Sequence, residues 1–224
     1  MRISTGATFP FHHCSKCKYK NMPTFWDERF AAEEYVYGKA PNTFFAQYIE
    51  SRPPGRLLLP MEGEGRNAVF AARMGWEVDA FDASVEGIRK ARNLAQREGV
   101  GFNYLHHRVE DFPWPKERYD LVALVFAHLP ADIRPGIHQK VSESLKPGGQ
   151  LFVELFHPDQ LGRSSGGPKV ADMLYSPELL TADFPDIEFQ QLDRVETELA
   201  EGRYHQGEAV VTRGFGKKLG APKQ

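Results

Sequence analysis

Along the middle of the chain, short apolar segments alternate with segments whose hydrophobic residues recur at helical spacing. Short apolar segments predict five strands, at 57–61, 77–82, 102–106, 119–126 and 150–156. Helical spacing predicts helices between them, over 66–74, from the N-cap Ser84 to a stop before Gly99, and over 133–145. Strands that alternate with helices in this way predict an α/β fold, a Rossmann-like, doubly wound and mostly parallel sheet.

Further elements flank this alternation. Helices are predicted at 25–35 and 42–51, before the first strand. After the fifth strand, a loop over 157–175 is too long to be a plain connector. The segments 187–199 and 207–214 then predict a C-terminal antiparallel hairpin.

Length and composition favour one ordinary globular domain. The 224 residues are 41% hydrophobic and 26% charged, enough for one large α/β domain and too few for two. We expect this domain over 25–216, with an N-terminal extension over 1–24 and a flexible tail over 217–224. A net charge of -2 provides no field for holding nucleic acid or an anionic membrane. No apolar run reaches about 18 residues, which excludes a membrane-spanning helix.

Cys14 and Cys17 are the only cysteines, and they cannot build a disulfide framework. A reducing cytoplasm is therefore the predicted location. With His12 and His13 they form a candidate zinc cluster, but no second pair of ligands follows at metal-site spacing. We predict no metal site.

The stretch LLLPMEGEGRNAVF, residues 57–70, joins the first predicted strand to the following helix. From Gly63 it fits the dinucleotide fingerprint G-x-G-x-x-G/A, and Asp82 follows at a distance suited to ribose hydroxyls. One interpretation is therefore an NAD(P)-dependent oxidoreductase. However, a pyrophosphate would lie beside Glu62 and Glu64, with only Arg66 to compensate their charge. S-adenosylmethionine has no phosphate and carries a positive sulfonium and ammonium, which favours it as the cofactor.

Several motifs extend this interpretation: WDERFAAEEYVYGKAPN (26–42), EGEGRNAVFAARMGWEVDAFDAS (62–84), VFAHLP (125–130), LKPGG (145–149) and ELFHPDQLGRSSGGP (154–168). On these motifs the chain from Trp26 to Phe215 resembles the class I S-adenosylmethionine-dependent methyltransferases. It is most similar to the tellurite-resistance branch with its thiopurine-methyltransferase relatives. The resemblance implies a small-molecule methyl acceptor, and we expect a monomer or homodimer.

The resemblance also implies roles for individual residues. It places the Gly63–Gly65 backbone beneath the methionine, Asp82 on both ribose hydroxyls, and Val109 with Glu110 at the adenine edge. The full set of expected cofactor contacts is Glu62, Gly63, Glu64, Gly65, Asp82, Ala83, Val109, Glu110, Phe126, Ala127 and Tyr37.

Three positions depart from the family pattern. Leu59 replaces the usual acidic residue of the first strand, and Met61 replaces the first glycine of the loop. We expect Glu62 to supply the missing carboxylate for the ammonium group. Arg108 stands at the usual acidic adenine position, so a side-chain contact to the adenine amine is not expected from it.

For the acceptor end we predict His128 and Arg163 as the catalytic residues, and His157 and His205 as structural or exposed. No carboxylate–histidine pair is predicted there. A phenol or amine needs a base, so we expect a soft, already anionic acceptor instead: a thiolate, a selenide or a reduced tellurium oxyanion.

For several of these residues, a purely structural or solvent-exposed role is the alternative. Asp82 is a candidate cap for the following helix, and Glu64 a candidate solvated loop residue. His128 is a candidate structural residue, and Tyr37 a candidate for packing the N-terminal helix onto the sheet. An alternative function for the whole protein is that of a regulator that binds the cofactor without catalysing a reaction.

Overall fold

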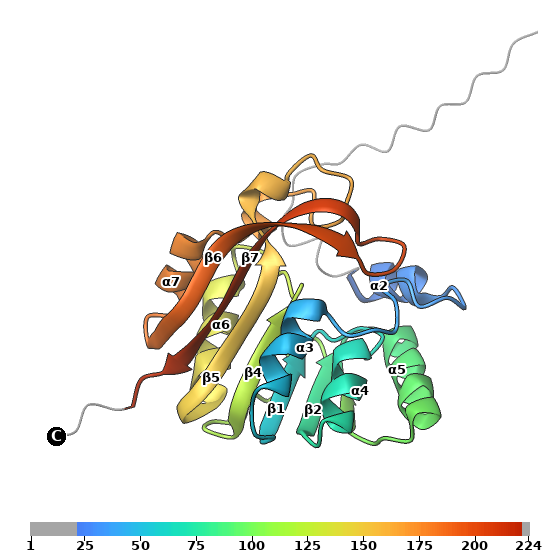
Figure 1. Cartoon of the computed structure of the whole chain (residues 1–224), viewed down its shortest axis with the longest axis horizontal. Helices are drawn as coiled ribbons and strands as arrows, with labels where there is room; N and C mark the ends of the chain where they lie inside the picture. The colour runs from blue at the N-terminus through green and yellow to red at the C-terminus, as the bar shows by residue number, and fades with distance from the viewer. Residues whose placement is uncertain (1–21, 221–224) are drawn as a thin grey trace, which may run out of the picture.

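The computed structural model of the protein describes residues 22–220, which are built on a seven-stranded sheet in the order β3-β2-β1-β4-β5-β7-β6 (Figure 1). The strands are β1 (Arg56–Pro60), β2 (Glu77–Asp82), β3 (Asn103–His106), β4 (Tyr119–Val125), β5 (Leu145–Phe156), β6 (Ile187–Ala200) and β7 (Gln206–Lys218). The first five are parallel, and β7 pairs antiparallel with both β5 and β6. The predicted doubly wound sheet with a C-terminal antiparallel hairpin is confirmed.

Helices cover both faces of the sheet. One face carries α3 (Thr43–Glu50), α4 (Arg66–Arg73) and α5 (Val85–Glu98), and the other carries α6 (Arg134–Ser144) and α7 (Pro177–Asp183). Side chains of β1 alternate between the two layers: Leu57 and Leu59 belong to the core under α3–α5, and Leu58 to the core under α6 and α7. A central strand buried on both faces explains the continuous apolar run in the sequence.

The first described helix, α2 (Met22–Phe30), lies beyond the carboxyl ends of the parallel strands (Figure 1). It ends at Phe30, whereas the sequence predicted helix to residue 35. Lys90 on α5 explains the early end, because its Nζ donates to the backbone carbonyls of Phe30, Ala32 and Glu34. The buried ammonium group thus donates hydrogen bonds to backbone carbonyls that would bond within the helix if it continued to residue 35.

Two strands are longer than predicted. β5 begins at Leu145 rather than at residue 150, because Leu145 pairs with Tyr119 ahead of a bulge. β7 continues to Lys218, whose Nζ donates to the carbonyls of Ser142 (2.8 Å) and Leu145 (2.9 Å). Lys218 therefore belongs to the ordered sheet rather than to a flexible tail.

The turn between β6 and β7, residues 201–205, reaches over the carboxyl edge of the sheet towards α2 (Figure 1). Its Arg203 N–H donates to the carbonyl of Val36 (2.9 Å). Gly202 makes the approach possible, since a Cβ there would lie 2.5 Å from the backbone N of Gly38. Two segments far apart in sequence thus meet above the sheet.

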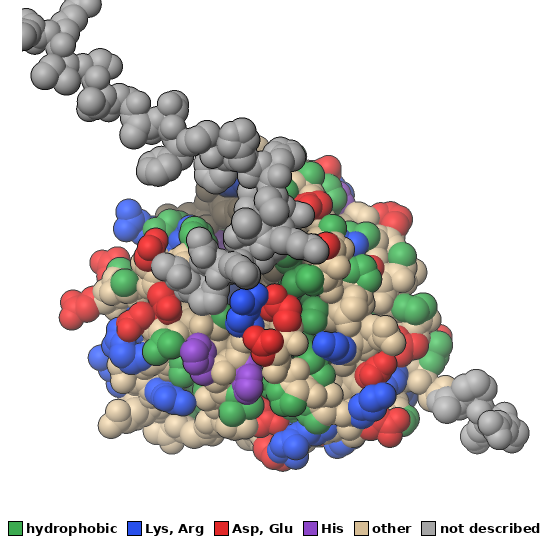
Figure 2. Space-filling view, turned by 180° about the vertical axis from the view of Figure 1, so that it is seen from behind, with side chains coloured by type: hydrophobic (Ala, Val, Ile, Leu, Met, Phe, Trp, Pro, Cys, Tyr) green, Lys and Arg blue, Asp and Glu red, His purple; other side chains and the backbone are tan. Residues whose placement is uncertain are grey.

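Figure 2 shows the face opposite to that of Figure 1, where acidic and basic side chains are interspersed. Among residues 22–220, no helix has the length and apolar character needed to span a membrane. Nor do three metal-ligating side chains gather anywhere in that range. The candidate zinc cluster around Cys14 and Cys17 lies outside the described residues.

Candidate active site

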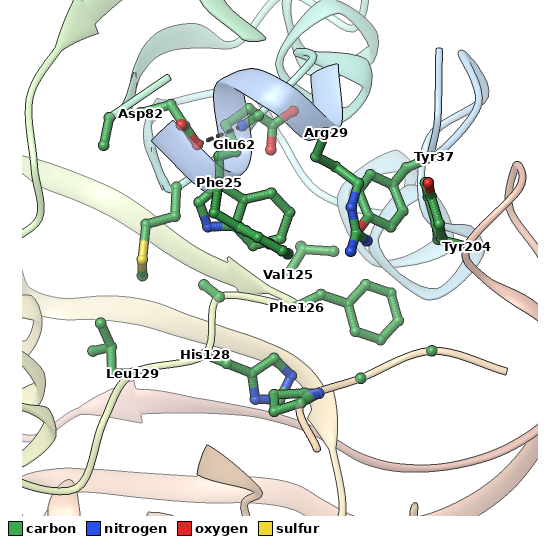
Figure 3. Close-up of a pocket in the computed structure, with 18 of the residues that line it drawn as sticks. Phe25, Arg29, Tyr37, Glu62, Asp82, Val125, Phe126, His128, Leu129 and Tyr204 are labelled. Carbon is green, nitrogen blue, oxygen red and sulfur yellow. Dashed lines mark hydrogen bonds between the residues drawn. The ribbon is translucent and has the colours of Figure 1, made fainter. Parts of the chain in front are cut away.

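A cavity of about 680 Å³ opens above the carboxyl ends of β1, β2 and β4 (Figure 3). Its walls come from the loops after these strands, from α2 and from the β6–β7 turn. Asp82 lies at one end, whereas Arg29, Tyr37 and Tyr204 lie together at the other. The cavity spans the switch point between β1 and β4, where doubly wound sheets bind their ligands.

Nearly all the predicted cofactor-binding residues line this cavity. They are Glu62, Gly63, Glu64, Asp82, Ala83, Val109, Glu110, Phe126, Ala127 and Tyr37. Gly65 is the exception and has a packing role. Its φ of 83° is left-handed, and a Cβ there would lie 2.4 Å from the Cβ of Ala91 on α5. Gly65 thus lets α4 begin close against α5.

Asp82 ends β2 with its carboxylate facing the glycine loop. Its Oδ2 accepts from Gly63 N–H (2.9 Å) and its Oδ1 from Ser84 N–H (2.8 Å), so one lone pair on each oxygen remains for a further donor. Ser84 caps α5 with its own hydroxyl, which accepts from Gly87 N–H (3.0 Å). Burial outweighs the backbone bonds and raises the pKa of Asp82 to about 6. The geometry therefore favours ligand binding over helix capping.

Glu62 is bound to the start of α4. Its Oε1 accepts from the N–H groups of Asn67 (2.8 Å) and Ala68 (2.9 Å), and its Oε2 from Asn67 Nδ2 (3.2 Å). Burial raises the pKa of Glu62 to about 7 despite these bonds. Met61 before it has a φ of 53°, a conformation that glycine adopts without strain and that fits the glycine which the family resemblance implies at this position. A contact from Glu62 to an ammonium group stays a prediction.

Glu64 faces the protein rather than solvent. Its carboxylate lies 2.5 Å from Lys90 Nζ, with both side chains 3% exposed, and accepts from the N–H groups of Val36 and Tyr37 (3.2 Å each). The alternative of a solvated loop residue is therefore wrong. Glu64 acts on the cavity by holding Tyr37 at its wall, where the Tyr37 hydroxyl accepts from Arg29 (3.0 Å).

The loop after β3 forms the far wall beyond Asp82. The Val109 carbonyl accepts from Trp114 Nε1 (3.0 Å), and its N–H has no partner within residues 22–220. Glu110 pairs with Arg108 at 2.9 Å near the surface. The free Val109 N–H is suited to the nitrogen edge of a purine.

Aromatic rings form the opposite end. Phe126 has a φ of 52°, rare for a bulky residue, and this turns its ring onto Phe156 (4.7 Å between centroids) and His205 (4.4 Å). Gly166 has a φ of 125°, and a Cβ there would lie 2.7 Å from His205 Cδ2 and from the Tyr204 carbonyl. The Gly-Gly loop after β5 therefore packs directly against this ring cluster.

Known proteins match this architecture. A methyltransferase domain model matches residues 61–149. The probable thiol methyltransferase 2 of Arabidopsis thaliana is 30% identical over 193 residues, covering 82% of this chain and 81% of the relative. The chain belongs to the class I S-adenosylmethionine-dependent methyltransferases. Thiocyanate methyltransferase 1 of Brassica oleracea is 29% identical over 146 residues, 63% of each chain. A structure solved for the conversion of a disulfide bond into a thioacetal group during echinomycin biosynthesis shares the fold, with a TM-score of 0.69 at 17% identity over 88% of this chain and 92% of the other.

S-adenosylmethionine is the cofactor of this methyltransferase, and the NAD(P) interpretation is set aside. The residues present fit it: Asp82 offers two open acceptor positions for the ribose hydroxyls, and Val109 an unpaired N–H for the adenine. When bound, the cofactor supplies an electrophilic methyl group on its sulfonium. The placement in the tellurite-resistance branch stays a prediction.

The methyltransferase holds His128 in a structural position. Its Nδ1 lies 2.7 Å from the Met173 carbonyl, and its Nε2 accepts from Phe156 N–H (3.2 Å), so both ring nitrogens are occupied by backbone. Burial lowers the pKa of His128 to about 4, which leaves the ring uncharged. This arrangement favours the structural alternative for His128 over a direct role in orienting an anion.

Arg163 does not line the cavity, and the sequence missed two groups that do. One is Arg29, whose guanidinium bonds Tyr37 and lies 4.0 Å from the Tyr204 ring centroid. The other is His205, with Nδ1 3.5 Å from Glu201 Oε2. The expectation that no carboxylate–histidine pair exists at the acceptor end is wrong. The antiparallel hairpin was predicted, but the reach of its turn over the cavity is a tertiary feature.

Proposed function

We propose that this methyltransferase methylates the sulfur of a small thiol, or a similarly soft anion, at the aromatic end of the cavity. The observation that carries the proposal is the separation of charges in the lining. Among the described residues, four acidic side chains line the cavity. Glu62, Asp82 and Glu110 lie at the cofactor end, and the charge of the fourth, Glu64, is paired with Lys90. The acceptor end combines aromatic rings with the guanidinium of Arg29.

Such a lining suits a polarisable nucleophile with negative charge. Phe126, Phe156 and Tyr37 exclude water, which strengthens the attraction of Arg29 for an anion. Direct displacement then depends on alignment and desolvation rather than on a covalent protein group. The thiol and thiocyanate methyltransferases similar to this chain support sulfur as the acceptor atom. Selenium and tellurium oxyanions share this softness and extend the candidate set.

A panel of acceptors tests the proposal: a thiol, thiocyanate, selenite, tellurite, a catechol and an amine, with adenosylhomocysteine formation as the readout. We expect turnover with the sulfur acceptors and little with the catechol or amine. Preferential methylation of the catechol or amine would overturn the proposal.

Two arginine variants identify the group that orients the anion. We expect Arg29→Gln to raise KM for thiocyanate about tenfold, because a charge-assisted contact of about 1.4 kcal/mol is lost. Arg163→Gln, the position predicted from sequence, should leave KM unchanged because that residue lies outside the cavity lining. The reverse pattern would restore Arg163 to the acceptor site.

The cellular location and the oligomeric state both stay predictions. A cytoplasmic monomer or homodimer remains our expectation, and size-exclusion chromatography with light scattering measures the second.

A further inference from the structure

His205 occupies an unusual place for a histidine on a hairpin turn. It is only 5% exposed and lines the acceptor end of the cavity. Its ring lies 4.4 Å from the Phe126 centroid, 4.6 Å from Tyr37 and 5.3 Å from Phe156. These contacts fix the position of the imidazole, although it comes from a turn.

Glu201, four residues earlier, bonds the back of the ring. Its Oε2 lies 3.5 Å from His205 Nδ1 and 2.7 Å from an Arg66 nitrogen, and its Oε1 accepts from Asn42 Nδ2 (3.0 Å). Burial alone would raise the pKa of Glu201, but the bond from His205 and the charge of Arg66 hold it at about 2. A permanently ionised carboxylate keeps the ring proton of His205 on Nδ1.

The other ring nitrogen is open to the cavity. Within residues 22–220 no group bonds His205 Nε2, and the atom is not sealed from the cavity space. With the proton fixed on Nδ1, Nε2 keeps a lone pair that is available to a ligand in the cavity, which His205 lines. This is the geometry of an oriented general base.

The charges around the ring favour its neutral form. Burial lowers the pKa of His205 below its ordinary value; the bond from Glu201 opposes this, and the charges of Arg66 on α4 and Arg29 on α2 add to the lowering. The remaining neighbours are the rings of Phe126 and Phe156, the hydroxyl-bearing rings of Tyr37 and Tyr204, Gly166, and the uncharged imidazole of His128. The ring is thus able to accept a proton at neutral pH.

We propose that His205, oriented by Glu201, is the general base that removes the proton from a neutral thiol acceptor. The inference rests on the proposed function. The S–H bond breaks with its electron pair left on sulfur, and an N–H bond forms at Nε2. The thiolate is the nucleophile, and the imidazolium later returns its proton to water.

A series of thiols whose pKa values lie above and below the assay pH, from alkyl thiols to the more acidic aryl thiols, tests this role. A thiol of pKa about 8.5 is only about 3% ionised at pH 7, so losing the base should lower kcat/KM about 30-fold. Thiols already ionised at pH 7 should lose less than about threefold. We therefore expect the penalty of His205→Gln to shrink as the thiol pKa falls, and to shrink for every thiol as the pH rises to 9.

A spectroscopic readout needs no turnover. The thiolate of an aryl thiol absorbs at longer wavelength than the thiol, so its ionised fraction is measured directly in the complex with adenosylhomocysteine. Wild-type protein should show bound thiolate below the solution pKa, and His205→Gln should not. Glu201→Gln keeps the ring and should give a smaller penalty with the same dependence on thiol pKa.

His157→Gln is the matched control, because His157 lies outside the cavity lining and should change neither readout. An equal penalty over the whole thiol series, or an unchanged thiolate signal in His205→Gln, would overturn the inference and leave His205 a packing residue. Wild-type protein that methylates neither a thiol nor thiocyanate, selenite or tellurite would instead refute the proposed function.

Discussion

Replacement of Asp82 is the most direct test of the cofactor end. The carboxylate keeps one lone pair on each oxygen after binding Gly63 and Ser84, and the two ribose hydroxyls require two acceptors. Hydrogen bonds to a charged group contribute about 1.5–3 kcal/mol each. Asp82→Ala removes both, and even with partial compensation by water we expect at least about 100-fold weaker binding, equivalent to about 2.7 kcal/mol.

Asp82→Asn removes the negative charge of the side chain while keeping its shape, so it tests the contribution of the charge. Its amide keeps one oxygen acceptor, but its nitrogen must face the N–H of either Gly63 or Ser84, both of which are donors. We expect at least tenfold weaker binding from the loss of one charged bond. Asp120→Asn is the matched control, because Asp120 pairs with Lys146 (2.7 Å) away from the cavity and should leave affinity unchanged.

The pH dependence of binding adds an independent readout. Asp82 has a pKa raised to about 6 by burial, and hydroxyl donors favour its charged form. Affinity should therefore rise with pH through about 6 and level off above about 7. Glu62 titrates nearby, with a pKa raised to about 7, so the Asp82 contribution is the part of the pH slope that disappears in Asp82→Asn.

Calorimetric titration with S-adenosylmethionine and with adenosylhomocysteine between pH 5 and 8 measures both effects, with thermal melts confirming that each variant is folded. Less than threefold weakening in Asp82→Ala, or the same pH slope in wild type and Asp82→Asn, would refute the ribose assignment.

Two further predictions concern stability. Lys90→Met leaves the buried carboxylate of Glu64 unpaired and should lower the free energy of unfolding by about 3–5 kcal/mol. The control Arg73→Met breaks the exposed Arg73–Glu98 pair and should lower it by less than about 1 kcal/mol. Equal losses for the two variants in urea titrations would contradict the anchoring role of Lys90. His128→Ala should lower the free energy of unfolding by about 2 kcal/mol with unchanged cofactor affinity, because two backbone groups lose their partner. The pKa of His128 is about 4 in the folded protein and about 6.5 in the unfolded chain, so the unfolded chain binds more protons between these values. The free energy of unfolding therefore falls as the pH falls from 6.5 to 4. If His128→Ala shows the same dependence of unfolding free energy on pH as wild type, His128 is not its source.

The position of Asp82 was predictable because every step is local. An apolar strand pattern ends at Asp82, Ser84 caps the next helix, and the carboxyl ends of parallel strands share one edge. The partners of Glu62 and Glu64 were not predictable in the same way. The two acids on either side of Gly63 both suggested a cationic ligand, yet Glu62 binds the start of α4 and Glu64 binds Lys90. A side chain's partner depends on which element packs above it, and no local pattern records that.

At the acceptor end, the reach of the β6–β7 hairpin was likewise not predictable from local sequence. β5 ends at Phe156, which pairs with Val211, so residues 206–210 continue past the end of β5. At about 3.3 Å per residue, these five residues carry the turn roughly 17 Å beyond the partner strand, far enough to cover the cavity. Side chains on a strand change face at every residue, so a register shift of one residue would turn the adjoining side chains away from the cavity. The overhang and its register therefore determine whether His205 reaches the acceptor with Glu201 bonded to its Nδ1, and both depend on pairings that only the folded sheet defines.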